Sequence, residues 1–362
     1  MITMFNLRKY LCIILSIFTL LLIQSCKDTI KKRNGFKQAK ILTKFEKIDI
    51  SISAEPYCVR LLNDSVILVN NTYWNNTMLV ELYSLKNNRR FSVPIVSGKY
   101  KQGIPDCICI LNSNADNFFK VNVMCDNTIY TVNADSILKH GIFCFDSQFS
   151  YLNISDDRSD IFLTDSMHYV AHNIEYINDS LYNNGYSSPL FKGKINPDTL
   201  VSTEYNYVNS DVNGVLIFFN NKTKEIWSAD LYSDKISIYD NSLNVIKTID
   251  MHENIKPSYV INDKKVGVTN QFIKFKAKKI KTFTDYFITS NHVYLTYVGR
   301  KEKKSEETYM EVFKLDLYGN LITDYIVNRY IYSISVDKSE KYLYCLTNQK
   351  GRKAPVLLKY EL

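Results

Sequence analysis

Glycine and proline are both scarce in this sequence, at 11 and 7 of 362 residues. This scarcity excludes collagen-like chains and Gly/Pro-rich low-complexity chains. Turns must therefore be built from Asn, Asp and Ser, whose side chains hydrogen-bond to nearby backbone groups. Tyrosine is abundant, with 27 residues, and the charged fraction of 23% is ordinary for a globular protein. The composition predicts a folded chain that makes most of its turns without glycine.

The apolar segment near the start of the chain is too short to cross a membrane. It covers residues 10–23, YLCIILSIFTLLLI, whereas a spanning helix takes about 20 apolar residues. Arg8 and Lys9 precede it and a small residue, Ser25, follows it. A basic start, a short apolar segment and a small residue before the cleavage site are typical of a secretory signal.

Residues 23–26, IQSC, resemble the bacterial lipobox, in which the cysteine receives the lipid. An ordinary signal peptide followed by a chance cysteine is the alternative. The resemblance predicts that residues 1–25 are a lipoprotein signal peptide and that Cys26 is the lipidation site. Residues 26–40 then form the lipidated N-terminus and a linker. We expect the protein at the outer membrane or elsewhere in the cell envelope, on the periplasmic face or the cell surface.

The cysteines do not form a metal or redox motif. Cys107 and Cys109 are separated by one residue in a strand-like run, without a CxxC spacing or a second Cys/His pair. Disulfides are permitted outside the cytoplasm, but a large core does not need them. We expect buried thiols, with one disulfide as the alternative, at the six positions that remain: Cys58, Cys107, Cys109, Cys125, Cys144 and Cys345.

The chain is rich in strand signals, and no stretch after the signal segment reads as an amphipathic helix. Short aromatic and β-branched runs are bounded by Asn, Asp and Ser clusters, a pattern typical of a sandwich, barrel or propeller. The expected strands include Ser65–Asn71, Met78–Leu85, Phe118–Met124, Val215–Asn220, Glu225–Ala229, Val293–Val298 and Tyr342–Thr347.

A repeat favours the propeller. Residues 238–246, IYDNSLNVI, match residues 314–322, KLDLYGNLI, without a gap. Each reads as a strand, a turn begun by Asp and a second strand, which is the outer hairpin of a four-stranded blade. Weaker copies occur at residues 144–152, 83–88 and 194–201.

The spacing of the repeats predicts six blades over residues 41–362. Anchored at Ser84, Asp146, Asn196, Asp240 and Asp316, the copies are 62, 50, 44 and 76 residues apart. Propeller blades repeat at about 40–50 residues, so the last spacing implies an insertion. A propeller that does not close exposes a strand edge. We expect Ile41–Ile52 to pair beside Val356–Leu362 and close the ring.

Three passages resemble the TolB-like six-bladed β-propeller lipoproteins of Gram-negative bacteria. Residues 96–106, VSGKYKQGIPD, are similar to a Gly-rich stretch of that family, and residues 287–299, FITSNHVYLTYVG, to its fifth-blade strand pair. Residues 315–344 are the closest match. The resemblance implies an all-β six-bladed propeller and a lipid anchor, and it brings no catalytic residues.

No enzymatic or nucleic-acid function is indicated. The net charge of +8 falls to +6 when Arg8 and Lys9 are removed, which is mild for this length. His168 and His172 lie about 13 Å apart along a strand, too far to share a zinc ion, and no GxSxG or P-loop motif occurs. We predict no cofactor. A hydrolase or lyase with a hub metal, held by residues of separate blades, is the alternative.

Two loops are candidates for partner recognition. Residues 176–189 are rich in Tyr and Asn, a mixture suited to binding, and include Tyr182 and Tyr186. Residues 254–281 are rich in lysine, and residues 273–278, IKFKAK, alternate apolar residues with Lys, as a protected edge strand does. A polyanion or lipid-headgroup site is the other interpretation of Lys274, Lys276 and Lys278.

Asp-Ser/Thr followed by an aliphatic residue recurs along the chain. This tripeptide resembles the O-glycosylation signal of exported proteins in some Gram-negative anaerobes, although an Asx turn that enters a strand uses the same residues. The candidate acceptors are Ser65, Ser136, Ser180 and Thr199. Together, these features predict a membrane-anchored propeller that binds a protein, peptide or glycan without catalysis.

Overall fold

The computed structural model of the chain consists of strands and one short helix. It describes residues 35–49, 55–74, 77–87, 89–94, 108–111, 118–123, 128–140, 145–150, 161–163, 168–172, 190–194, 215–251, 255, 259–262, 272–275, 280–301, 309–348 and 355–362. The described residues all belong to one compact unit, residues 34–362.

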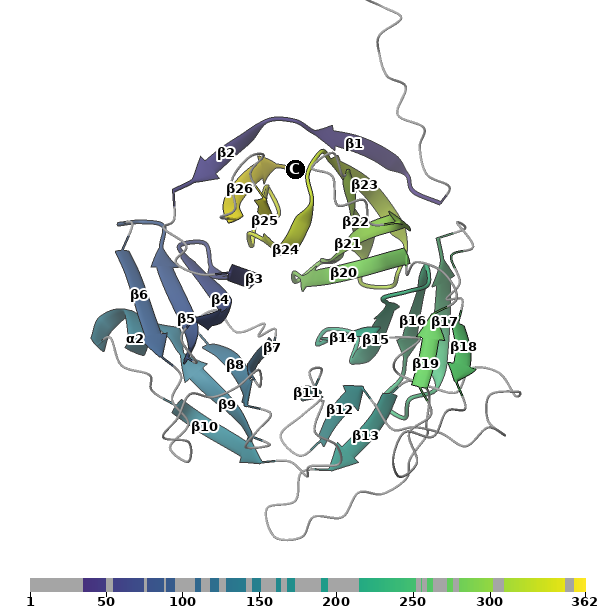
Figure 1. Ribbon diagram of the computed structural model, residues 1–362, viewed down its shortest axis with the longest axis horizontal. Helices are drawn as coiled ribbons and strands as arrows, with labels where there is room; N and C mark the ends of the chain where they lie inside the picture. Colours follow the sequence, from purple (N-terminus) through teal and green to yellow (C-terminus); the bar gives the residue numbers. More distant parts are fainter. Residues whose placement is uncertain are drawn as a thin grey trace, which may run out of the picture. The chain divides into compact units, whose positions relative to one another are not determined.

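Antiparallel sheets follow one another along the chain (Figure 1). The first contains β3 (Glu55–Asn63), β4 (Val66–Trp74), β5 (Thr77–Ser84) and β6 (Arg89–Pro94). The second contains β7 (Ile108–Leu111), β8 (Phe118–Val123), β9 (Thr128–Asn133) and β10 (Phe145–Ser150). The third contains β11 (Ile161–Leu163), β12 (His168–His172) and β13 (Leu190–Lys194).

In the second half of the chain, each sheet is again built mainly from strands that are consecutive in the sequence. One sheet contains β14 (Val215–Asn220), β15 (Glu225–Asp230), β16 (Lys235–Tyr239) and β17 (Val245–Asp250). A two-stranded sheet of β18 (Tyr259–Asn262) and β19 (Phe272–Phe275) follows. The next contains β20 (Ile280–Ile288), β21 (His292–Lys301), β22 (Met310–Asp316) and β23 (Leu321–Val327). The last contains β24 (Ile331–Val336), β25 (Tyr342–Asn348) and β26 (Pro355–Glu361).

All seven predicted strands are confirmed within a few residues. The pair β18–β19 also supplies the insertion predicted between the two strongest repeats. The expectation of no helix is wrong, because α2 (Ala134–His140) connects β9 to β10. Asn133 caps this helix, with its Oδ1 accepting hydrogen bonds from the backbone N–H groups of Asp135 and Ser136.

The N-terminal segment supplies outer strands to the last two sheets. β2 (Phe45–Ile48) pairs antiparallel with β26, with Phe45 opposite Tyr360. The predicted pairing of this segment with the C-terminal strand is therefore confirmed for four residues. Its boundaries were wrong, because β1 (Gln38–Leu42) pairs parallel with β23 of the preceding sheet instead. Figure 1 shows β1 and β2 running along β23 and β26.

The two strongest repeats form the same turn. Asp240 Oδ1 accepts hydrogen bonds from the backbone N–H groups of Ser242 and Asn244, at 2.8 and 2.9 Å. Asp316 does the same with Tyr318 and Asn320, at 3.0 and 2.8 Å. An Asp side chain therefore begins each turn, as the composition predicted.

The fourth residue of each of these turns is left-handed. It is Leu243 in one turn, with φ 63°, and Gly319 in the other, with φ 78°. A Cβ at Gly319 would lie 2.7 Å from Ile249 Cδ1, so Ile249 would have to shift to admit a side chain there, and the positive φ itself favours glycine.

The predicted number of six four-stranded blades is wrong. The described residues form four four-stranded sheets, while the β20–β23 sheet has five strands with β1, the β11–β13 sheet has three and β18–β19 has two. The weaker repeat copies caused the error. Residues 145–150 form a single strand, β10, rather than a hairpin, and the residues after Lys194 in the Asn196 copy lie outside the described ranges.

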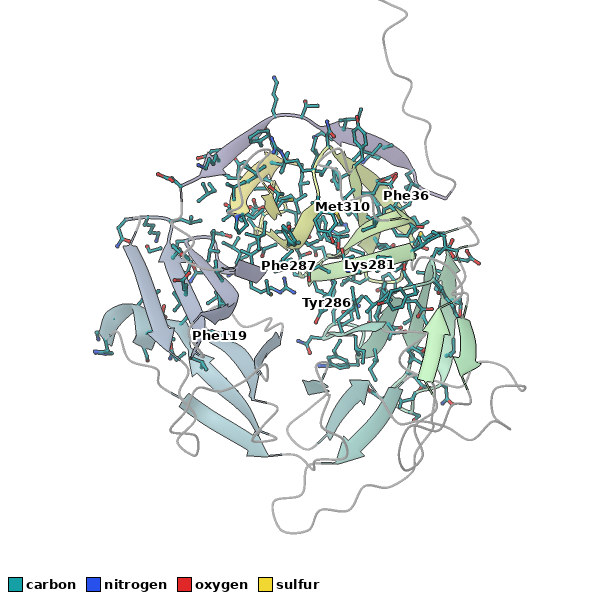
Figure 2. The ribbon with its side chains drawn as sticks, in the orientation of Figure 1. Phe36, Phe119, Lys281, Tyr286, Phe287 and Met310 are labelled. Carbon is teal, nitrogen blue, oxygen red and sulfur yellow. The ribbon has the colours of Figure 1, made fainter. Side chains whose placement is uncertain are left out.

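The core consists of layers between neighbouring sheets. One cluster joins the β14–β17 sheet to the β20–β23 sheet and includes Phe36, Trp227 and Phe313. A second joins the β20–β23 sheet to the β24–β26 sheet through residues such as Met310 and Leu358. Phe36 and Met310 are labelled in Figure 2. Sheet-against-sheet burial of this kind gives a propeller its stability, so adjacent sheets are held face to face.

Candidate functional site

A cavity of about 470 Å³ lies where the first strands of four sheets end. These strands are β3, β14, β20 and β24, and each ends in a turn that contributes to the wall. The lining residues are Leu61, Leu62, Asn63, Asp64, Asn220, Asn221, Lys222, Phe287, Ile288, Thr289, Ser290, Val336 and Lys338. The volume lies in the range of small-ligand sites, which is about 300–1,000 Å³.

The lining divides into an apolar part and a polar part. The strand ends contribute buried apolar side chains, namely Leu61, Leu62, Phe287, Ile288 and Val336. The turns contribute Asn221, Lys222 and Ser290, which are exposed. Two lysines and one aspartate line the cavity, so the formal charge of its wall is positive by one. An apolar surface with a few convergent polar groups is the usual character of a ligand site.

Asparagine side chains shape two of the turns around the cavity. Asn63 Oδ1 accepts hydrogen bonds from the backbone N–H and the hydroxyl of Ser65, at 2.9 and 2.8 Å. Asn220 is buried, and its Oδ1 accepts from the backbone N–H of Lys222 at 3.1 Å. Its Nδ2 donates to the carbonyl of Leu317 at 3.1 Å, which fixes the β14–β15 turn against the next sheet. The turns are therefore held by their own side chains.

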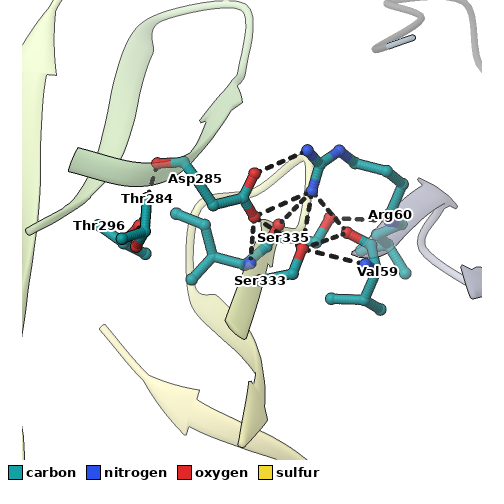
Figure 3. Close-up of polar contacts among 9 residues, drawn as sticks. Val59, Arg60, Thr284, Asp285, Thr296, Ser333 and Ser335 are labelled. Atoms are coloured by element: carbon teal, nitrogen blue, oxygen red, sulfur yellow. Dashed lines mark hydrogen bonds and ion pairs between the residues drawn. The ribbon is translucent and has the colours of Figure 1, made fainter. Parts of the chain in front are cut away.

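A buried ion pair joins two of the strands that line the cavity (Figure 3). Arg60 of β3 donates from Nη2 to Asp285 Oδ1 at 2.8 Å and from Nη1 to Asp285 Oδ2 at 3.1 Å, across 225 residues of sequence. Both residues are buried, at 7% and 8% exposure. Leu61 and Phe287, which line the cavity, lie within two residues of this pair.

The third strand is tied to the same pair. Asp285 Oδ2 accepts hydrogen bonds from the hydroxyl of Ser333 at 2.6 Å and from the backbone N–H of Ile334 at 2.8 Å. Ser333 also accepts from the backbone N–H of Val59 at 3.0 Å. These bonds connect β3, β20 and β24, so the three strand ends at the cavity are fixed relative to one another.

The charges in this network stabilise each other. Burial lowers the pKa of Arg60, but the nearby Asp285 carboxylate outweighs burial and holds this pKa above its usual range. Burial raises the pKa of the Cys58 thiol, with the Arg60 charge opposing it. Arg60 therefore stays charged at neutral pH, and Cys58 stays a protonated thiol.

A second polar cluster adjoins the cavity through Thr289. The Glu340 carboxylate accepts from Thr289 Oγ1 at 2.5 Å and from Lys314 Nζ at 3.0 Å, and it lies 2.5 Å from His292 Nδ1. Burial raises the pKa of Glu340, but the hydrogen bonds from Thr289 and Lys314 and the neighbouring cations outweigh burial and lower it overall. Glu340 therefore fixes the β20–β21 turn against the turn after β24.

Most of the residues proposed from sequence for binding or modification lie outside the described ranges. These are Cys26, Tyr182, Tyr186, Lys276, Lys278, Ser180 and Thr199. Lys274 lies in β19, opposite Val260 of β18, so the predicted strand is confirmed there. Ser65 lies in the β3–β4 turn and Ser136 in α2, and their glycosylation stays a prediction.

The described residues include no group of three or more His, Cys, Asp or Glu side chains suited to a metal ion. His168 and His172 are the two ends of β12, opposite Lys194 and Leu190 of β13. Within the same ranges, Cys58 and Cys345 are buried and not in a disulfide, as predicted for these two positions. No helix there has the length and apolar character to cross a bilayer.

The sequence interpretation missed the cavity and the ion pair. The available signal was the Asn that ends β3 and β14, since both strands lead into a turn with a polar residue next, Asp64 or Asn221. Nothing in the local sequence relates Arg60 to Asp285. Only the packing of β3 beside β24, and of β24 beside β20, brings these positions together.

No protein-family model matches the chain, and no curated protein sequence matches it. Among solved structures, the chain is similar to a member of the DUF4221 family from Bacteroides vulgatus, with a TM-score of 0.54 and 9% identity over 88% of this chain and 96% of that one. It is also similar to the β-propeller domain of Cps50 (Swd1) from Myceliophteria thermophila, with a TM-score of 0.45 and 8% identity over 88% of this chain and 100% of that one.

A third similar structure is the C-terminal WD40 domain of Sif2, with a TM-score of 0.40 and 9% identity over 90% of this chain and 99% of that one. At these identities the likeness concerns the fold alone. The fold is an all-β propeller, in agreement with the sheets described above. The TolB-like family is not confirmed by these comparisons.

Proposed function

We propose that this protein is a lipid-anchored propeller of the cell envelope that binds a protein, peptide or glycan and does not catalyse a reaction. The cavity at the ends of β3, β14, β20 and β24 is the observation that carries the proposal. Its wall combines an apolar surface with amide, hydroxyl and ammonium groups from separate turns. The buried hydrogen bonds of Arg60, Asp285 and Ser333 connect three of the strands that form it. Turn residues on a rigid scaffold are the usual place for recognition.

Filling the cavity is expected to abolish ligand binding. Ser290 lies in the β20–β21 turn, is exposed and lines the cavity, so tryptophan there occupies ligand space without disturbing the core. The protein, purified from membranes in detergent, is screened against peptide and oligosaccharide arrays, and hits are measured by calorimetry. We expect Ser290→Trp to weaken binding at least about tenfold, which corresponds to roughly 1.4 kcal/mol.

The matched control is Tyr318→Ala. Tyr318 is 67% exposed on a turn and does not line the cavity, so this change should leave affinity unchanged. Asn221→Trp, in the opposite wall, provides a second way to fill the cavity. Ligands that bind equally well to both tryptophan variants, or arrays without any hit, would contradict the proposal.

The anchor is tested separately. Residues 23–26 resemble a lipobox, and one acyl chain contributes about 0.8 kcal/mol of membrane binding per buried CH₂ group. We expect Cys26→Ala to release the protein from the membrane fraction, whereas Cys58→Ala, at a buried thiol, should not. The measurement is the distribution of the protein between membrane and soluble fractions. A Cys26→Ala protein that still sediments with membranes would refute the lipid anchor.

The sequence resembles the TolB-like lipoproteins in the three passages given above, and this resemblance supports the same non-enzymatic role. No observation among the described residues favours the alternative of a hub-metal hydrolase or lyase.

A further inference from the structure

We infer that the cavity binds the carboxyl-terminal end of a peptide whose last residue is apolar. This inference rests on the proposed function and selects one class of ligand within it. Three features of the wall carry it: the sign of its charge, the polar groups not engaged elsewhere, and the extent of its apolar surface.

The charge of the wall suits one negative group. The wall carries two positive side chains, Lys222 and Lys338, and one negative side chain, Asp64. Asp64 Oδ1 already accepts a hydrogen bond from the backbone N–H of Lys338 at 3.2 Å. Lys222 has no ion-pair partner among the described residues. A ligand with a single carboxylate near Lys222 therefore neutralises the wall, and a charge-assisted hydrogen bond to its ammonium group is among the stronger ones.

The polar groups beside Lys222 suit a peptide backbone. Asn221 precedes Lys222 in the same turn, and Ser290 lies in the turn of another sheet. No hydrogen bond within the described residues engages the amide of Asn221 or the hydroxyl of Ser290. An amide offers both donors and an acceptor, and a hydroxyl offers one of each kind. These groups match the alternating N–H and C=O groups that precede a carboxyl terminus.

The apolar part of the wall suits the last side chain. Five buried apolar residues come from three sheets, and Phe287 is the one aromatic residue among the lining residues. Burial of an apolar side chain against this surface is favourable because it removes apolar area from water. A sugar ring carries hydroxyl groups on most of its carbons, and this surface would leave them without partners. The wall therefore favours an apolar peptide end over a glycan.

The experiment uses matched pairs of acetylated tripeptides that end in Leu, Ile, Val or Phe, each as the free acid and as the carboxamide. Binding to the full protein in detergent is measured by calorimetry, with octanoate as a second probe. We expect at least one free acid to bind about tenfold more tightly than its amide. Lys222→Gln should remove this difference, and Ser290→Trp should abolish binding of both forms.

Lys224→Gln is the matched control. Lys224 lies two residues from Lys222, is exposed and does not line the cavity, so its neutralisation should leave the preference for the acid intact. Equal affinity for acid and amide, or an unchanged preference in Lys222→Gln, overturns the inference.

The outcomes also separate this inference from the proposed function. Binding of octanoate without binding of any tripeptide would identify a free amphiphilic acid as the ligand and overturn the peptide assignment. An oligosaccharide whose binding is lost in Ser290→Trp would likewise overturn it, while the proposed function would stand. If no ligand is sensitive to Ser290→Trp, both fail.

Discussion

Replacement of Arg60 by alanine is expected to destabilise the protein by about 3–5 kcal/mol, the usual cost of removing one partner of a buried ion pair. Asp285 would keep its hydrogen bonds from Ser333 and Ile334 but would lose the cation 2.8 Å away while still buried. The measurement is the free energy of unfolding from denaturant titration. An unchanged slope with denaturant would show that the change is one of stability.

The control for this prediction is an exposed ion pair in the same protein. Glu46 of β2 lies 3.1 Å from Lys359 of β26, and its side chain is 65% exposed. Because such surface pairs contribute about 0–1 kcal/mol, Glu46→Ala should have a small effect. The double variant Arg60→Met with Asp285→Leu should recover much of the loss, since two apolar groups leave no buried charge. An Arg60→Ala protein as stable as Glu46→Ala would show that the pair does not hold the strands.

Deletion of residues 35–49 is expected to have an effect at least as large. This segment contains β1 and β2, so its loss leaves β23 and β26 as bare edges and removes two buried side chains, Phe36 and Leu42, at 1% and 5% exposure, from the core. Phe36 alone packs its ring 4.8 Å from that of Phe313. Phe36→Ala should therefore cost about 3–5 kcal/mol, and the deletion should cost more and promote aggregation through the exposed edges.

Phe45→Ala is the matched control for Phe36→Ala. Phe45 lies in β2 of the same segment but is 45% exposed, and its ring contacts Tyr360 and Arg329 at the surface. We expect a loss of roughly 1 kcal/mol, as for a partly exposed aromatic pair. Thermal unfolding of the deletion protein at the temperature of the full chain would refute the role of the segment.

The sequence predicts the strands and the Asp turns correctly because both depend on residues only a few positions apart. Alternating apolar residues predict a strand because side chains alternate between the two faces. Asp240 and Asp316 predict hairpins because a carboxylate accepts from the N–H groups two and four residues ahead. The weak copy around Asp146 failed because residues 145–150 form one strand preceded by α2. A single Asp does not distinguish a turn from a position within a strand.

Three properties follow from the amino-acid sequence without the structure: the chain is all-β, its turns depend on Asn and Asp, and the segment near Phe45 pairs with the C-terminal strand. These properties follow from side-chain periodicity and from hydrogen bonds that span a few residues. The tertiary structure alone decided that Arg60 meets Asp285 across 225 residues, that β1 joins a different sheet from β2, and that four strand ends enclose a cavity. Contacts between sheets depend on which faces pack together, and no local pattern encodes that choice.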